Sequence, residues 1–279
     1  MTIRIVTDST CDLPESIIQQ YDISLIRIPV IIDSREYRDG VDITRAEFYE
    51  RLPGLRPAPT TAAPGLGEFR RVYEDLASRG ARQILSIHVS STLSAVFNIA
   101  SQAAREVTSA AVTVFDSMQL SLGVGFLALS AAQAAAQGLG LDAILALLRD
   151  QVQRTRTFAV LDTLEYLRRG GRVRSVVAAL SNLLQIKPFI KMYNGVVTSE
   201  RVRTYRAARE RLIALLASHH PFERVGILHA HVAEKTRTLL ADARALLLDT
   251  EIWVEELNPV VGAHLGPGAI GFATVSARI

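Results

Sequence analysis

The sequence predicts an α/β fold made of two α/β domains, with mainly parallel sheets flanked by helices. Short runs rich in β-branched residues alternate with helical patterns along the whole chain, which is typical of parallel strands joined by crossover helices. A length of 279 residues suits one large domain or two medium ones. Hydrophobic residues make up 49% of the chain, which is enough for a sizeable core.

The first half alternates four expected strands with helices. Pro14 begins the first helix, in the position where proline is favoured. Thr44 and Glu47 form a capping box that begins the second helix. A loop rich in proline, glycine and threonine covers 53–67. The expected strands are 3–7, 25–32, 83–88 and 111–115, and the later helices are 68–78, 93–106 and 122–137. The last of these helices is almost wholly apolar, so we expect it to be buried on most sides.

The second half continues the alternation, so we expect domains at 1–155 and 156–279. Asn194-Gly195 is a strong type I′ turn signal and predicts a hairpin between two strands. The expected strands are 157–161, 186–192, 196–198, 224–228, 251–254 and 272–275, and the expected helices are 164–168, 173–184, 205–217 and 234–247.

Composition excludes several classes of protein. A net charge of +3 with scattered arginines and only 6% aromatic residues does not favour a nucleic-acid binder. The most apolar stretch, 126–136, is too short for a transmembrane segment. The N-terminus shows no signal-peptide pattern, and Cys11 is the sole cysteine, so no intramolecular disulfide can form. These observations predict a cytoplasmic protein.

Several familiar sequence motifs are present in part but do not predict their usual functions here. Residues 266–271 match G-x-G-x-x-G, but they lie too close to the C-terminus for a dinucleotide-binding βαβ unit to follow. His229 and His231 lack further ligands at recognisable spacing, which favours no metal. Asp8 ends the first strand and invites an aspartyl-phosphate interpretation. The second acid expected two residues later is Thr10, so Asp8 is more typical of a turn residue that bonds its own backbone.

Hydroxyl side chains gather in two loops, at 60–61 and at 90–94. Such residues most often cap helices. Both loops, however, fall at strand ends or just before helices, which is the ligand-binding edge of an open α/β sheet. We expect His264 to lie in a glycine-rich loop after a strand-like segment, where it is either a functional group or a turn histidine bonded to the backbone.

Taken together and in order, these segments resemble the DegV family of fatty-acid-binding proteins over nearly the full length. The matching segments are 7–14 (TDSTCDLP), 59–61 (PTT), 90–94 (SSTLS), Asp116-Ser117 with Ser121 and Gly123, 164–172 (LEYLRRGGR), 186–188 (IKP), Arg203 and 264–269 (HLGPGA).

The resemblance implies a fatty-acid tunnel at and near the domain interface, and a carrier that is not itself an enzyme. It implies that the carboxylate is bound by Thr61, Ser94 and His264. Arg172 and Arg203 match further basic positions, which the resemblance connects with the ligand or a partner. The partner it implies is a separate ATP-binding fatty-acid kinase subunit, with no cofactor beyond the bound fatty acid.

This chain departs from the family pattern at three positions. Ala62 and Ala95 stand where serine and glycine are usual, and Leu265 stands where threonine is usual. Two alternatives stay open at this stage. One is a stand-alone phosphatase or transferase that uses Asp8 and Ser9, and the other is a regulatory lipid-binding protein.

Overall fold

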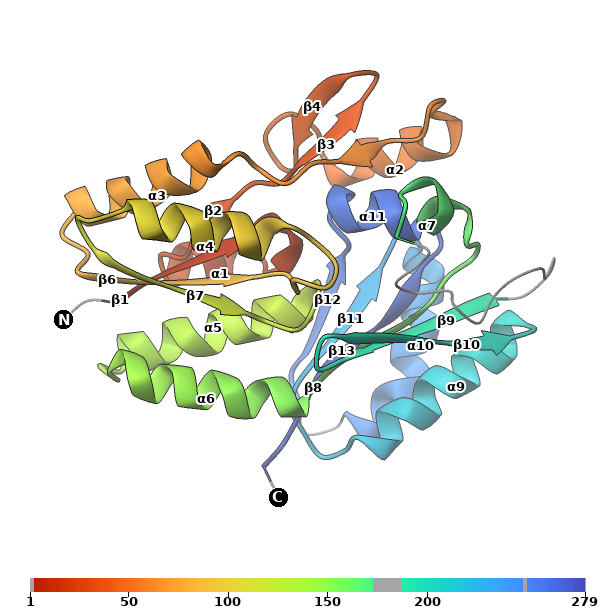
Figure 1. The fold of residues 1–279 in the computed structure, drawn as a ribbon. Helices are drawn as coiled ribbons and strands as arrows, with labels where there is room; N and C mark the ends of the chain where they lie inside the picture. Colours follow the sequence, from red (N-terminus) through yellow and green to blue (C-terminus); the bar gives the residue numbers. More distant parts are fainter. Residues whose placement is uncertain (1–2, 173–186, 248–249, 279) are drawn as a thin grey trace.

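The computed structural model describes residues 3–172, 187–247 and 250–278. The strands of these residues form three sheets, shown in Figure 1. The expected helix at 173–184 lies outside the described residues. The α/β fold predicted from the alternating pattern is confirmed.

The first sheet is fully parallel, as predicted. Its strands run in the order β2-β1-β6-β7. Their bounds are β1 (Ile3–Asp8), β2 (Ser24–Ile26), β6 (Gln83–His88) and β7 (Ala111–Asp116). Three helices accompany them, namely α1 (Glu15–Gln20), α3 (Leu66–Ser78) and α4 (Val96–Glu106). Because helices cover the sheet, β1 and β6 are buried along most of their length.

The second sheet has six strands and is mostly antiparallel, in the order β10-β9-β8-β13-β11-β12. Only β11 and β12 run parallel. This differs from the mainly parallel sheet that we expected. The physical reason is that β13 returns into the middle of the sheet, antiparallel to both neighbours. The strands are β8 (Thr155–Val160), β9 (Lys187–Tyr193), β10 (Val196–Val202), β11 (Phe222–His229), β12 (Ile252–Glu256) and β13 (Ile270–Ser276).

One helix, α5 (Leu122–Ala136), lies between the two large sheets (Figure 1). It contacts β1 and β6 on one side and β8, β11 and β13 on the other. Nearly all of its residues are buried, as its apolar composition predicted. The outer face of the second sheet packs instead against α9 (Tyr205–Ser218) and α10 (Ala233–Ala243). Helix α6 (Leu141–Arg154) follows α5, and the remaining helical elements of the second half are α7 (Glu165–Arg169), α11 (Pro259–Leu265) and the short 3-10 turn η3 (Arg244–Leu246).

A small antiparallel sheet has the strand order β4-β3-β5, and β3 and β4 lie at the top of Figure 1. Its strands are β3 (Pro29–Ile32), β4 (Arg35–Arg38) and β5 (Thr60–Thr61), and the elements beside it are η1 (Ser9–Cys11), α2 (Arg45–Arg51) and η2 (Leu52–Gly54). The capping box of Thr44 and Glu47 is present at the start of α2. The small sheet contacts α11 through β3 and β5.

No helix in the described part of the chain has both the length and the apolar character needed to cross a membrane. The large sheets are built from residues 3–116 and 155–276 respectively. Domains that meet near residue 155 stay a prediction.

Candidate functional site

A cavity lies between the loops of the first half and the inner face of the second sheet. The space between the side chains that line it is about 1110 Å³, part of which is open to solvent. Most of its wall is apolar, formed by Ile28, Ala63, Val89, Leu93, Leu120, Phe158, Ala159, Leu167, Ile190, Met192, Val197, Leu228, Leu257, Val260, Val261, Leu265 and Ile270.

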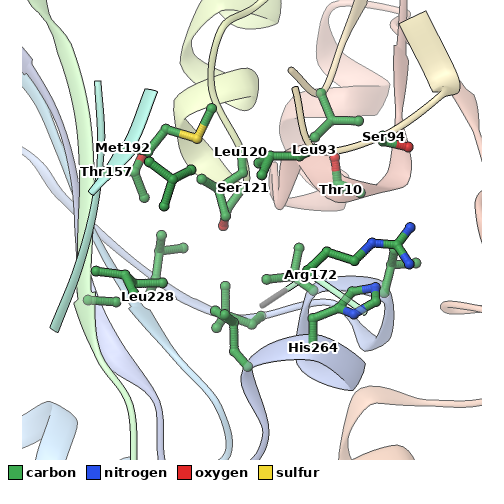
Figure 2. A pocket seen from close by; sticks show the side chains of 18 of the residues that line it. Thr10, Leu93, Ser94, Leu120, Ser121, Thr157, Arg172, Met192, Leu228 and His264 are labelled. Carbon is green, nitrogen blue, oxygen red and sulfur yellow. The ribbon is translucent and has the colours of Figure 1, made fainter. Parts of the chain in front are cut away.

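The three residues predicted to bind a carboxylate all line this cavity. The hydroxyl oxygen Oγ1 of Thr61 lies 2.9 Å from Nε2 of His264. Figure 2 shows Ser94, Arg172 and His264 at one end of the cavity, and Met192 at the other. The cavity therefore has the head-group candidates at one end and a mostly apolar wall elsewhere, which suits a molecule with a polar head group and an apolar tail.

His264 lies in the last turn of α11, and not in a loop as the sequence suggested. Asn258 begins this helix, with its side-chain oxygen accepting a hydrogen bond from the backbone N–H of Val261. Gly266 ends the helix with a positive φ of 75°. The histidine ring packs closely against Gly170, because a Cβ added there would lie 2.2 Å from Nδ1 of His264. The ring is thus held between Thr61 and the end of α7.

Electrostatics keep His264 neutral. Burial, together with the positive charge of Arg172, lowers the pKa of His264 from 6.5 to about 4. The guanidinium of Arg172 donates a hydrogen bond to the carbonyl of Gly170, 2.9 Å away. Within the described part of the chain, Nδ1 of His264 is buried and has no hydrogen-bond partner. A positive arginine and a neutral histidine at the same end suit an anionic group.

Ser94 lies in the loop between β6 and α4. Its Oγ accepts a hydrogen bond from the backbone N–H of Val96, 3.3 Å away, which leaves its proton able to serve a ligand. The expected helix at 93–106 begins later, at Val96, and this loop conformation lets Ser94 reach the cavity. Ala95 provides no side-chain cap for α4. Ala62 lines the cavity, where it adds a methyl group and no hydroxyl.

Sequence reasoning gave no role to two other hydroxyls of the cavity wall, Thr10 and Ser121. Thr10 donates its proton to Asp8, and Ser121 donates its proton to Asp12. Both carboxylates are fully buried. Only the oxygens of these two hydroxyls are left to face a ligand. Both residues fall in segments that resemble the DegV family, but only the fold reveals where their protons go.

Asp8 is placed as a structural acid and not as a nucleophile. Its carboxylate accepts hydrogen bonds from the backbone N–H groups of Thr10 and Val89, each 3.0 Å away, and lies 3.0 Å from Nδ1 of His88. Burial alone would raise the pKa of Asp8, but these partners outweigh it and lower the pKa. Neither Asp8 nor Ser9 is among the described residues that line the cavity. The interpretation of Asp8 as a turn residue that bonds its own backbone is confirmed.

The other candidates lie outside the polar end. Arg203 is exposed between β10 and α9, so its contact with a ligand or partner stays a prediction.

Among the described residues, no group of histidine, cysteine and acidic side chains is arranged to hold a metal. The glycine-rich loop serves close packing: a Cβ added at Gly266 would meet the ring of Tyr166, and one added at Gly268 would meet Asp162.

Comparison with known families identifies relatives over the whole chain. A family model described as an uncharacterised protein of the DegV family matches residues 2–277. Protein DegV of Bacillus subtilis is 32% identical over 276 residues, which cover 97% of this chain and 98% of that protein. A DegV domain-containing protein of Listeria monocytogenes is also 32% identical, over 273 residues that cover 96% of each chain.

Solved structures agree with the sequence relatives. The crystal structure of DegV from Bacillus subtilis, described as a fatty acid binding protein, superposes with a TM-score of 0.91 at 31% identity, covering 99% of this chain and all of that one. A DegV family protein from Thermus thermophilus, described by its fatty acid binding, gives a TM-score of 0.89 at 32% identity, with 99% and 100% of the two chains covered.

Proposed function

This chain belongs to the DegV family, and on that premise we propose that it binds one long-chain fatty acid in its apolar cavity. The bound acid presents its carboxylate to a separate kinase subunit, which binds ATP and forms the acyl phosphate. The carrier itself performs no chemistry, uses no cofactor and works in the cytoplasm. The observation that supports this proposal most is the arrangement of the cavity, because Thr61, Ser94, Arg172 and His264 gather at one end and the rest of the wall is mostly apolar.

The apolar wall supplies most of the binding free energy. Each buried methylene contributes about 0.8 kcal/mol, so a chain of about sixteen carbons gains on the order of 10 kcal/mol. This term needs no specific contacts, because it depends on the apolar area removed from water. The head group therefore has only to be oriented.

The carboxylate is oriented by Thr61, Ser94 and His264, and Arg172 balances its charge. Hydroxyl groups donate to a carboxylate, yet they cost less to bury than a fixed charge when the cavity is empty. The protons of Thr10 and Ser121 are already given to buried acids, so these two oxygens would repel a carboxylate. Ser94 keeps its proton available, which favours a head group beside Ser94.

The first experiment is extraction of the purified protein, followed by mass spectrometry of the lipid. We expect a long-chain fatty acid. Delipidated protein should then gain thermal stability when fatty acid is added, because a ligand that binds the folded state stabilises it. Absence of both signals would reject fatty-acid binding.

A second experiment tests the carrier role. The loaded protein is mixed with a fatty-acid kinase subunit and ATP, and acyl phosphate is measured. Formation only when both proteins are present supports presentation to a kinase. ATP hydrolysis by this chain alone would instead support a stand-alone phosphatase or transferase. Tight lipid binding without acyl phosphate would support the regulatory lipid-binding protein.

A further inference from the structure

The end of the cavity away from the head-group residues is formed by a hairpin. Met192 on β9 and Val197 on β10 are directly opposite each other in the antiparallel pair and both line the cavity. Figure 2 shows Met192 across the cavity from Arg172 and His264. The neighbouring Val196 lies on the other face of the hairpin, where it is 61% exposed. Met192 and Val197 thus close the cavity at the far end of its apolar part. We call this pair of side chains the floor.

The tip of this hairpin is attached to the loops of the first half. The backbone N–H of Gly195 donates to the carbonyl of Met118 at 3.0 Å, and the hydroxyl of Thr92 donates to the carbonyl of Gly195 at 2.9 Å. Gly195 also packs closely on Met118, since a Cβ added there would lie 2.8 Å from its sulfur. These contacts fix the position of the hairpin, so the floor is part of the rigid wall.

Beside the floor, the cavity wall includes a hydroxyl group that belongs to a buried chain of hydrogen bonds. Thr157, which pairs with Met192 across β8 and β9, donates its proton to the side-chain oxygen of Gln119 at 3.0 Å. The amide nitrogen of Gln119 donates to the carbonyl of Thr155, also at 3.0 Å. A chain that pushed into this side would leave buried polar groups without partners, which is costly. The apolar floor is the part that can vary without that cost.

We propose that the cross-strand pair of Met192 and Val197 sets the length of acyl chain that the protein accepts. The proposal rests on the fatty-acid binding proposed above. A chain whose terminal methyl reaches the floor fills the cavity. A longer chain has to displace Met192 or Val197 or leave its head group out of place. Methionine is unbranched and adaptable, so neighbouring lengths are tolerated, while the β-branched valine is stiff.

The test uses Met192→Ala and a series of straight-chain saturated fatty acids of increasing length, in competition with a fluorescent fatty acid on delipidated protein. The substitution removes the outer atoms of the methionine side chain and deepens the cavity. Each further buried methylene strengthens binding by roughly fourfold. An acid two carbons longer than the wild-type optimum should therefore gain roughly fifteenfold in affinity relative to that optimum.

The opposite change is Val197→Phe, which raises the floor and should move the optimum to shorter acids. Val196→Phe is the matched control, because it places the same ring one residue away on the opposite face. We expect the control to keep the wild-type order of affinities. An unchanged order in both cavity variants, or an equal shift with the control, overturns the role of the floor. A wild-type protein that binds no acid in the series would instead reject fatty-acid binding itself.

Discussion

Thr61 and His264, which are 203 positions apart in the sequence, meet with Oγ1 and Nε2 at 2.9 Å. A neutral imidazole has one donor nitrogen and one acceptor nitrogen. Nδ1 of His264 has no hydrogen-bond partner in the described part of the chain and lies against Gly170. An acceptor is less costly to leave unpaired there than an N–H group. We therefore expect Nε2–H to donate to Thr61, which leaves the threonine proton for a carboxylate.

Gly170→Ala should disturb the head-group site without straining the backbone. Gly170 has a φ of −76°, which alanine adopts readily, but the new Cβ would lie 2.2 Å from Nδ1 of His264. We expect the ring to turn away from Thr61, so that the preference for a fatty acid over the matching fatty alcohol decreases. Gly65→Ala is the control, since a Cβ there meets nothing within 4 Å. Binding assays with both ligands would reveal equal losses if His264 had no role at the head group.

Fatty acid should raise the pKa of His264. Burial and Arg172 hold this pKa at about 4, and a carboxylate nearby favours the charged imidazole. Titration of the ring followed by NMR, with and without ligand, measures the change. Fatty alcohol of the same length is the control, because it buries the ring without adding negative charge. An equal pKa with acid and with alcohol would place the carboxylate away from His264.

Because His264 is buried in its neutral form, the protein without ligand should lose stability as the pH falls. The pKa of His264 is lowered in the folded state, from 6.5 to about 4. The unfolded chain therefore binds this proton first as the pH falls, and the free energy of unfolding decreases between about pH 6.5 and pH 4. His264→Gln removes this titration, so urea unfolding should depend less on pH in that range. His219, whose pKa is also lowered to about 4, provides His219→Gln as a comparison that leaves the head-group site intact.

Asp12 holds together the starts of α2, α5 and α11. Its buried carboxylate lies 3.2 Å from Nη1 of Arg45, accepts the backbone and side-chain N–H groups of Asn258, and accepts the hydroxyl of Ser121. Asp12→Asn leaves the half-buried Arg45 without this charge, and we expect a loss of about 3 kcal/mol in the free energy of unfolding. Asp42→Asn breaks an exposed pair with Arg38 and should change it little. Similar losses in the two variants, measured by denaturant unfolding, would contradict this role of Asp12.

The sequence predicted the fold well where local pattern and tertiary structure agree. The apolar helix at 122–137 is buried between two sheets, and Asn194-Gly195 joins β9 and β10 as expected. The single strand expected at 25–32 is instead two strands in different sheets, because the chain leaves the first sheet after Ile26. There the N–H of Ile28 bonds to the hydroxyl of Ser9. A run of apolar residues does not encode where such a change of sheet occurs.

The candidate site was harder to predict from local pattern. Thr61, Ser94 and His264 were assigned through the family resemblance, since spacing alone cannot bring a β5 residue next to the end of α11. The short helix α11 (Pro259–Leu265) contains valines and a glycine, so its sequence did not predict a helix. The proton-donating roles of Thr10 and Ser121 depend on buried acids elsewhere in the fold, and no motif records them.

His264→Ala should weaken presentation to the kinase more than it weakens fatty-acid binding. The tail supplies most of the binding free energy, whereas His264 acts only on the head group, through Thr61. Without the N–H of His264 the Thr61 hydroxyl is no longer held in place to donate to the carboxylate, and losing that hydrogen bond to a charged group costs about 1.5–3 kcal/mol, which is small beside a buried chain. Phosphoryl transfer, however, needs an in-line approach of the carboxylate oxygen, so a loosely held head group should lower turnover strongly.

The experiment compares fatty-acid retention with acyl-phosphate formation for wild type and variant, using a cognate kinase subunit. Thr61→Val is a second variant, which keeps the shape of the side chain but removes the hydroxyl that pairs with His264. We expect both variants to retain fatty acid and to lose acyl-phosphate formation. If His264 only braced α11 against β5 and α7, stability would decrease and both measurements would decline together. Equal loss in the two assays, or unchanged phosphorylation, is the result that would reject the head-group role.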